Sequence, residues 1–260
     1  VDDVVAATPP LGWRRRARLH VVGGQVGFYA SGSHRVVPVR TCPQLDARLG
    51  PAIAAVVASA PADGEIALAV GYTGEVVTHR VGAPNPPLVE VDPGIMVPAD
   101  GFAQASSAGN AALVAAVVTA LQTLHVSGAV LELFAGAGNF TQALVAAGYL
   151  VTASDVVAPA RWPWAANFVS GPAHAATAQF SPGDFEAIVL DPPRVGAKET
   201  MPEIVRLSPR CIVYVSCDVA TLARDLEVLI SSGYRLTAVT PHDLMPQTAH
   251  IETVVVLVRS

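Results

Sequence analysis

Long apolar runs are missing from this sequence, and charges and cysteines are few. No run approaches the roughly 18 consecutive apolar residues that a membrane-spanning helix needs, and the start VDDVVAATPP has no basic or apolar signal-peptide region. Three cysteines cannot form a disulfide framework, which is typical of a reducing compartment. We therefore expect a soluble cytoplasmic protein with no membrane partner. We also expect it to be a monomer.

The sequence does contain enough apolar residues for a large core. Its 260 residues are 52% hydrophobic and 14% charged, which suits one large domain or two smaller ones. The net charge of -5 is unfavourable for binding nucleic acid over the whole surface, because phosphate contacts come from Lys and Arg. Basic residues are nevertheless concentrated at Arg14, Arg15, Arg16 and Arg18. Alone, such a run is as often a solvated strand face as a binding surface, and its position before an apolar segment predicts a basic edge strand.

Two regions differ in their patterns. Residues 1–97 contain short apolar segments separated by Gly and Pro, with a helical patch over 42–60, and this predicts a β-rich α+β domain. Residues 84–101 are rich in Pro and Gly and read as a linker. In residues 98–260, apolar strands alternate with helix-forming segments. That alternation predicts an α/β domain.

A reactive side chain is expected at Cys217. The apolar strand 213–215 ends abruptly in Ser216-Cys217-Asp218, and a segment with helical spacing of leucines follows. Ligands of open α/β sheets bind outside the carboxyl ends of the strands, and a helix N-terminus favours a thiolate. An isolated cysteine is more often a buried small hydrophobe, which is how Cys211 reads.

Three motifs change this balance. They are DPPR at 191–194, SCDxxTLARDL at 216–226 and QTxHIE at 247–252. In this order they resemble the RNA uridine-5-methyltransferase family, which uses S-adenosylmethionine to modify uridines in tRNA and 23S rRNA. The resemblance implies a Rossmann-like class I methyltransferase domain over 98–260, with residues 1–97 as a central RNA-binding domain.

The chemistry of uracil assigns roles to two of these residues. C5 of uracil is too weak a nucleophile to take a methyl group directly, so the ring must first be activated by covalent addition. Cys217 is the expected nucleophile at C6, and Glu252 is the expected base that removes the C5 proton. Alone, Glu252 would read as a solvated carboxylate at a strand edge. His250 is expected to position rather than to act as a base.

A further motif points to the cofactor. AVLELFAGAGNFT at 129–141 is a strand followed by a Gly-x-Gly turn and a helix, and glycine pairs alone are weak signals. The fuller pattern resembles the first motif of class I S-adenosylmethionine-dependent methyltransferases. By resemblance, the residues near the cofactor are Gln104, Phe134, Gly136, Gly138, Asn139, Asp155 and Asp191. The residues expected to contact RNA or the target base are Gln104, Asp191, Arg14, Arg15 and Arg16.

The segment between Asp155 and Asp191 departs from the family pattern. It is short, and Pro159 and Pro163 interrupt what should be a helix. Trp162 and Trp164 can stack on adenine or RNA bases, but large aromatics near prolines more often cover a shortened core. This segment leaves open how tightly the cofactor binds.

Three further questions stay open. Cys42 matches the last ligand of a [4Fe-4S] cluster found in many family members, but the other three ligands are missing here, so no metal site is expected in this chain. The cluster is expected only if a longer form supplies upstream cysteines, and a lineage that dropped the cluster is the alternative. The start of the sequence falls inside the family's second domain, so we expect a fragment of a longer protein. A catalytically silent RNA-binding module and a methyltransferase for another RNA base are the alternatives. Arg194 disfavours the latter, because adenine enzymes more often place an aromatic residue there.

Overall fold

The computed structural model describes residues 1–159, 162 and 165–260, which form two compact units. The larger unit comprises Val1–Ala7, Gly109–Leu244 and Thr248–Ser260, and the smaller comprises Thr8–Ala108 and Met245–Gln247. Over these described ranges, no helix is both long and apolar enough to cross a membrane.

The larger unit is built on an eight-stranded sheet in the order β1-β14-β15-β13-β12-β9-β10-β11. Its strands are β1 (Val5–Ala6), β9 (Ala129–Leu133), β10 (Leu150–Asp155), β11 (Asn167–Ser170), β12 (Ala187–Leu190), β13 (Cys211–Ser216), β14 (Tyr234–Asp243) and β15 (Glu252–Arg259). From β13 to β11 all neighbours are parallel, whereas β15 is antiparallel to β13 and β14. The parallel strands therefore all end at one edge, where ligands of such sheets bind.

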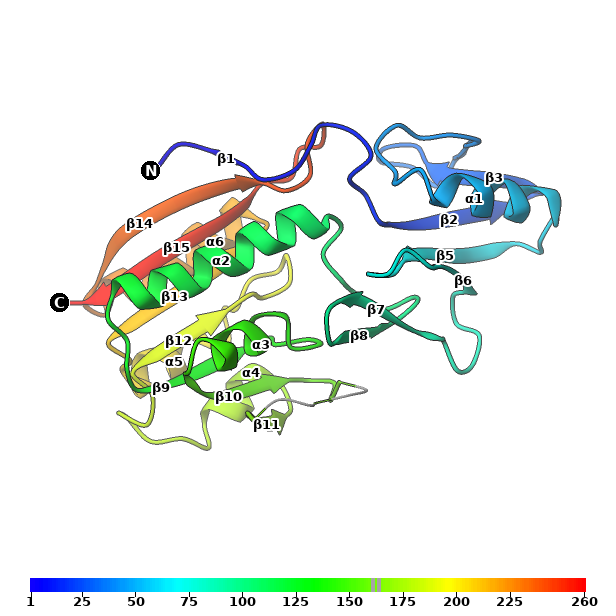
Figure 1. Ribbon diagram of the computed structural model, residues 1–260. Coiled ribbons are helices and arrows are strands. Elements are labelled where there is room, and N and C mark those ends of the chain that lie inside the picture. Colours follow the sequence, from blue (N-terminus) through cyan, green and yellow to red (C-terminus); the bar gives the residue numbers. More distant parts are fainter. Residues whose placement is uncertain (160–161, 163–164) are drawn as a thin grey trace. The chain divides into compact units, whose positions relative to one another are not determined.

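Helices cover both faces of this sheet. They are α2 (Ser107–Thr123), α3 (Asn139–Ala146), α4 (Ala173–Thr177), α5 (Met201–Leu207) and α6 (Val219–Ser231). Figure 1 shows α2 and α3 in front of the sheet, with α4, α5 and α6 behind it. One core cluster joins alternate residues of the central strands to leucines, Met201 and Ile204 of the rear helices. Strands covered on both faces need continuous apolar runs, and all six residues of β13 are buried.

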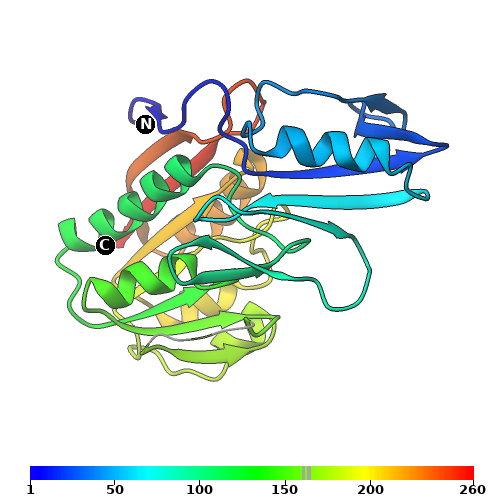
Figure 2. The same ribbon diagram turned by 45° about the vertical axis from the view of Figure 1, so that its right-hand side comes forward.

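The smaller unit is a five-stranded antiparallel sheet with one helix and a separate hairpin (Figure 2). Its elements are β2 (Arg16–Val22), β3 (Gln25–Tyr29), β4 (Val36–Pro38), α1 (Leu49–Ala58), β5 (Gly64–Val70), β6 (Val76–Arg80), β7 (Leu88–Asp92) and β8 (Ile95–Pro98). Ala17, Leu19 and Val21 alternate along β2 and join the core that includes Leu49 and Ile53 of α1. The period of two therefore gives the sheet one apolar face.

The α/β fold class with a separate β-rich unit is confirmed, but two local predictions are wrong. The basic run begins a central strand, because β2 pairs with β3 on one side and with β5 on the other. The pairing with β5 is distant in sequence and leaves no local signal. Residues 84–101 are also more than a linker, since the Pro93-Gly94 turn, with Gly94 at φ 78°, closes the hairpin of β7 and β8.

Candidate active site

The ends of β13 and β15 bring Cys217 and Glu252 together. In this antiparallel pair Ser216 lies opposite Thr253, so the next position along β13, Cys217, comes opposite Glu252. Glu252 is only 5% exposed, which is unusual for a carboxylate, and Cys217 is half-buried. Two residues 35 positions apart in the sequence thus share one edge of the sheet.

Asp191 and Arg194 reach the same edge from β12. Leu190 ends β12 opposite Tyr214 of the parallel strand β13, so Asp191 emerges one strand away from Cys217. The Nη2 group of Arg194 donates a hydrogen bond to Nε2 of His250 at 3.0 Å. The charges of Arg194, Asp191 and Glu252 all act on the thiol of Cys217. Three segments therefore meet in one cluster.

The thiol of Cys217 is not activated in the protein alone. Burial is the largest effect and raises its pKa, the negative charges of Glu252 and Asp191 raise it further, and Arg194 opposes them. The helix that follows contributes less than the sequence suggests. Asp218 caps α6 by accepting hydrogen bonds from the backbone N–H groups of Ala220 and Thr221, and its carboxylate offsets the positive end of the helix dipole.

Two carboxyl groups beside the thiol have pKa values near neutrality. Burial raises the pKa of Glu252 to about 7, against the lowering effect of Arg194. Burial and the charge of Glu252 raise the pKa of Asp191 to about 8. Carboxyl groups with such values exchange protons near physiological pH, and raised values of this kind are common at functional sites.

The turn after β9 has an unusual backbone. Phe134, Gly136 and Gly138 all have positive φ angles, of 61°, 56° and 88°. The conformation is strained for Phe134 and natural for glycine, and strained turns of this kind cluster at ligand sites. A Cβ atom added at Gly136 would meet nothing within 4 Å, so open space adjoins this residue.

Asp155 ends the neighbouring strand β10 and supports this turn. One carboxylate oxygen accepts a hydrogen bond from the N–H of Gly136 at 2.9 Å, and the other accepts from the N–H of Val157 at 3.1 Å. Glu132, on β9, is only 1% exposed, and its Oε2 accepts a hydrogen bond from Thr141. Burial is the main reason that its pKa rises to about 8.

Asn139 begins α3 and is engaged within the protein. Its amide exchanges two hydrogen bonds with the amide of Asn110 on α2, at 2.9 and 2.8 Å. The pair fixes the start of α3 against α2. The side chain assigned to the cofactor by resemblance therefore also joins two helices.

The three arginines of the basic run have different surroundings. Arg15 is 4% exposed, and all its nitrogens are engaged, with a bidentate ion pair to Asp92 and a bond to the carbonyl of Gln104. Arg16 donates to three carbonyls between residues 98 and 101, and burial lowers its pKa to about 10. Arg14 is half-buried. The burial of Arg15 gives it a role in holding the smaller unit together.

Gln104 and Cys42 belong to the smaller unit, whereas the residues of the cluster belong to the larger one. Gln104 is half-buried, and its backbone carbonyl accepts the bond from Arg15. Cys42 is a free, half-buried thiol. Within the part of the chain that the structure describes, no three His, Cys, Asp or Glu side chains form a group able to hold a metal ion.

Sequence reasoning missed one residue near the cluster, Asp225. It is 1% exposed and accepts hydrogen bonds from the hydroxyl of Tyr214 and the N–H of Ala197, both at 2.7 Å. A signal was present in the sequence. The buried positions of α6 are Leu222, Asp225 and Leu229, so a carboxylate interrupts an apolar helical stripe.

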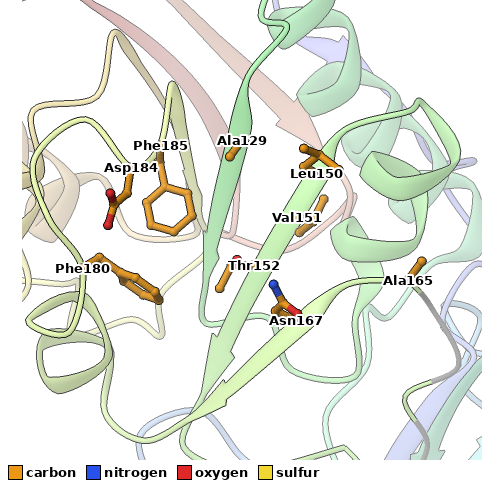
Figure 3. Close-up of a pocket in the computed structure, with 9 residues that line it drawn as sticks. All are labelled: Ala129, Leu150, Val151, Thr152, Ala165, Asn167, Phe180, Asp184 and Phe185. Carbon is orange, nitrogen blue, oxygen red and sulfur yellow. The ribbon is translucent and has the colours of Figure 1, made fainter.

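A separate pocket of about 450 Å³ lies at the opposite end of the sheet (Figure 3). Ala129 and Leu150 in its lining are the first residues of β9 and β10, whereas the candidate site lies where these strands end.

Trp162 donates a hydrogen bond to the carbonyl of Ala166 and packs edge-on against Phe168. Pro163 and Trp164 lie outside the described residues.

Comparisons with solved structures agree with this fold. The crystal structure of Pyrococcus abyssi tRNA (uracil-54, C5)-methyltransferase in complex with S-adenosyl-L-homocysteine superposes with a TM-score of 0.79. The match covers 98% of this chain and 78% of that one, at 22% identity.

Sequence comparisons identify a family in addition to the fold. A family model described as tRNA (Uracil-5-)-methyltransferase matches residues 177–260, which contain the cluster. An uncharacterized RNA methyltransferase of Thermotoga maritima is 58% identical over 78 residues, 30% of this chain and 18% of that protein. The 23S rRNA (uracil(1939)-C(5))-methyltransferase RlmD of Salmonella paratyphi A is 30% identical over an alignment that covers 100% of this chain and 73% of that protein. The chain therefore belongs to the RNA uracil-5-methyltransferase family.

Proposed function

We propose that this protein transfers a methyl group from S-adenosylmethionine to C5 of a uridine in RNA, through a covalent bond between Cys217 and C6. The observation that carries the proposal is the cluster of Cys217, Glu252, Asp191 and Arg194 at one edge of the sheet. A nucleophile, a base and an acid are needed for this chemistry, and the cluster supplies all of them.

The first step is the addition of the Cys217 thiolate to C6 of uracil. The new S–C6 bond displaces the C5=C6 electron pair toward the O4 carbonyl, and C5 becomes nucleophilic. Because the resting pKa of the thiol is raised, loss of its proton to solvent is a barrier, and Arg194 is the group that favours the anion. Asp191, whose pKa is about 8, is protonated at neutral pH and is suited to donate a hydrogen bond to the uracil edge.

The second step returns the enzyme to its starting state. When bound, S-adenosylmethionine would supply an electrophilic methyl group for C5 and would leave as S-adenosylhomocysteine. Glu252 then takes the remaining C5 proton, the C5=C6 bond re-forms, and the sulfur of Cys217 leaves C6. A base is most effective when its pKa lies near the working pH, and the pKa of Glu252 is about 7.

The turn after β9 fits the cofactor. Open space beside Gly136 leaves room for a ligand to approach the backbone, and the carboxylate of Asp155 lies at the end of the next strand. A carboxylate at that place is suited to accept hydrogen bonds from two ribose hydroxyls. Phe134 and Gly138 shape the turn, while Asn139 holds it against α2. We also retain Gln104 as a proposed contact to cofactor and base.

The smaller unit is the proposed grip on RNA. Unstacking a uridine costs a few kcal/mol, so contacts elsewhere on the RNA are needed to offset it. Arg18 is an exposed cation on β2, and Arg14 is half-buried, whereas Arg15 is engaged inside the unit. The relatives' names give 23S rRNA and tRNA as the two substrates for a test.

Covalent trapping tests the proposal. The protein is mixed with S-adenosylmethionine and RNA that carries 5-fluorouridine, with 23S rRNA and tRNA fragments in parallel, and analysed on a denaturing gel. Fluorine cannot leave C5 as a proton does, so an active enzyme stalls as an adduct. Cys217→Ala should abolish the shifted band. The matched control is Cys211→Ala, which changes the buried cysteine at the start of β13, the strand that precedes Cys217, and should keep the band.

Other outcomes would contradict the proposal. An adduct that persists in Cys217→Ala would remove Cys217 as the nucleophile. If folded wild-type protein binds RNA without any adduct and shows no binding of S-adenosylmethionine, the protein is instead a silent RNA-binding module.

A further inference from the structure

A buried network behind the candidate site links the loop that follows β12 to α6. Asp225 lies at its centre and is 1% exposed. Its Oδ2 accepts from the N–H of Ala197 and the hydroxyl of Tyr214, both at 2.7 Å, while its Oδ1 accepts from Nε and Nη2 of Arg224. None of these residues belongs to the reacting cluster itself.

The network attaches four consecutive loop residues to one helix. Thr221 donates a hydrogen bond to the carbonyl of Arg194 at 3.0 Å. Arg224 donates one to the carbonyl of Val195 at 2.9 Å. Gly196 packs so closely that an added Cβ would lie 2.6 Å from Asp225 and 2.5 Å from Arg224. The backbone N–H of Ala197 donates a hydrogen bond to the carboxylate of Asp225 and completes the series. Such a loop has little freedom to move relative to α6.

The same helix begins directly after Cys217. Asp218 is the N-cap of α6, so the turn that carries the thiol and the loop that carries Arg194 are both fastened to one element. The guanidinium of Arg194 extends from this loop to His250, at 3.0 Å. The groups that act on the thiol are Glu252 from β15 and Asp191 and Arg194 from the loop after β12.

We propose that Asp225 is a positioning residue for this reaction: through the loop of residues 194–197 it holds the guanidinium of Arg194 beside Cys217 and Glu252. The proposal rests on the proposed function, because it assigns Asp225 to the thiol's electrostatic surroundings and not to contact with substrate. A purely structural carboxylate would stabilise the fold without changing how Cys217 ionises. The two roles therefore differ in a measurable quantity.

That quantity is the pH profile of Cys217 alkylation by iodoacetamide, which requires neither RNA nor cofactor. Trypsin releases residues 211–224 as one peptide, and fragment ions separate Cys217 from Cys211. Because only the thiolate reacts, the midpoint of the profile reports the pKa of the thiol. Cys211 is fully buried and serves as an internal reference for unfolding.

Removing the guanidinium should raise the midpoint. Arg194→Gln should shift it upward by about half a unit to one unit, since a nearby cation favours the thiolate. Asp225→Asn should shift it in the same direction. In the double variant the shift should not exceed that of Arg194→Gln, because residues that act through one group are not additive. Gly196→Ala displaces the same loop with Asp225 intact and should reproduce the shift.

The control is Leu229→Val, a buried change on α6 outside the network, which should leave the midpoint unchanged. An unshifted midpoint in both Asp225→Asn and Gly196→Ala, with cooperative thermal unfolding retained, would overturn the proposal. Additive shifts in the double variant would also overturn it. If alkylation behaves as expected but no RNA adduct forms, the positioning role stands and the proposed reaction fails.

Discussion

The two halves of the large sheet hold their functional groups in different ways. In the half formed by β12 and β13, every residue of both strands is buried, and the loop after β12 is tied to α6. In the half formed by β10 and β11, β10 begins at the 75% exposed Leu150, and none of the four residues of β11 is buried. Covalent chemistry needs atoms fixed closely, whereas a cofactor is held by many weaker contacts.

The connections explain this contrast. The chain between β12 and β13 contains a helix with three buried residues, and α6 follows β13 with a full amphipathic face. Between β10 and β11 the described residues include no helix, and the helix that follows β11 has only five residues. We infer that changes in the first half mainly alter reaction rate, while changes in the second half mainly alter cofactor affinity.

The largest expected effect is that of Cys217→Ser. A serine hydroxyl ionises far less readily than a thiol, so the rate of methyl transfer should fall by roughly four orders of magnitude or more. Raising the S-adenosylmethionine concentration should not restore it. The measurement is transfer of a labelled methyl group to RNA at saturating cofactor. Recovery of the rate by added cofactor would mean that Cys217 affects cofactor affinity, against the expected difference between the halves.

Glu252→Gln should have the next largest effect, about a hundredfold to ten-thousandfold on turnover. Addition to C6 does not require the base, so the adduct with ordinary uridine RNA should accumulate. The base acts in its ionised form, and the pKa of Glu252 is about 7. Decay of the wild-type adduct should therefore accelerate as pH rises through about 7, and this dependence should vanish in the variant. Equal adduct levels in both proteins would argue that another group removes the proton.

A smaller effect is expected from Asp155→Asn in the second half. Loss of the charged acceptor should raise the KM for S-adenosylmethionine about tenfold with little change in kcat. Thr152→Val provides the matched control, since it changes a half-buried residue of the same strand that lines the separate pocket (Figure 3). A fall in kcat at unchanged KM would mean that Asp155 contributes to the reaction rate and not to cofactor affinity.

How far the sequence predicts this molecule differs from one residue to another. Strand ends at Asp191 and Cys217 are readable locally, because apolar runs stop at polar residues. The burial of Glu252 is not, since it depends on β15 entering the sheet antiparallel beside β13. The raised pKa of the Cys217 thiol arises mainly from burial, and further from charges that converge only on folding. The burial of Arg15 was not readable either, because its partner Asp92 lies in the hairpin of β7 and β8. The Pro- and Gly-rich composition of residues 84–101 predicts a linker in place of that hairpin.

The last expected effect concerns stability and comes from Glu132 on β9, the strand that precedes the turn of Gly136 and Gly138. Its pKa rises from 4.5 in the unfolded chain to about 8 in the fold, mainly through burial. Between these values the unfolded chain loses a proton that the folded protein keeps. Stability therefore falls as pH rises, by up to about 1.4 kcal/mol per pH unit for this group. Asp191 and Glu252, whose pKa values are also raised, act in the same direction.

Glu132→Gln removes one of these contributions and should make the Tm less dependent on pH between about 5 and 8. The measurement is thermal denaturation across that range, with Glu199→Gln as the control because its side chain is 84% exposed. Parallel curves for wild type and Glu132→Gln would mean that water or a shift of the backbone already solvates the carboxylate. Solvent would then reach Glu132 on β9, the strand that separates the two halves, even though its neighbours along that strand are buried.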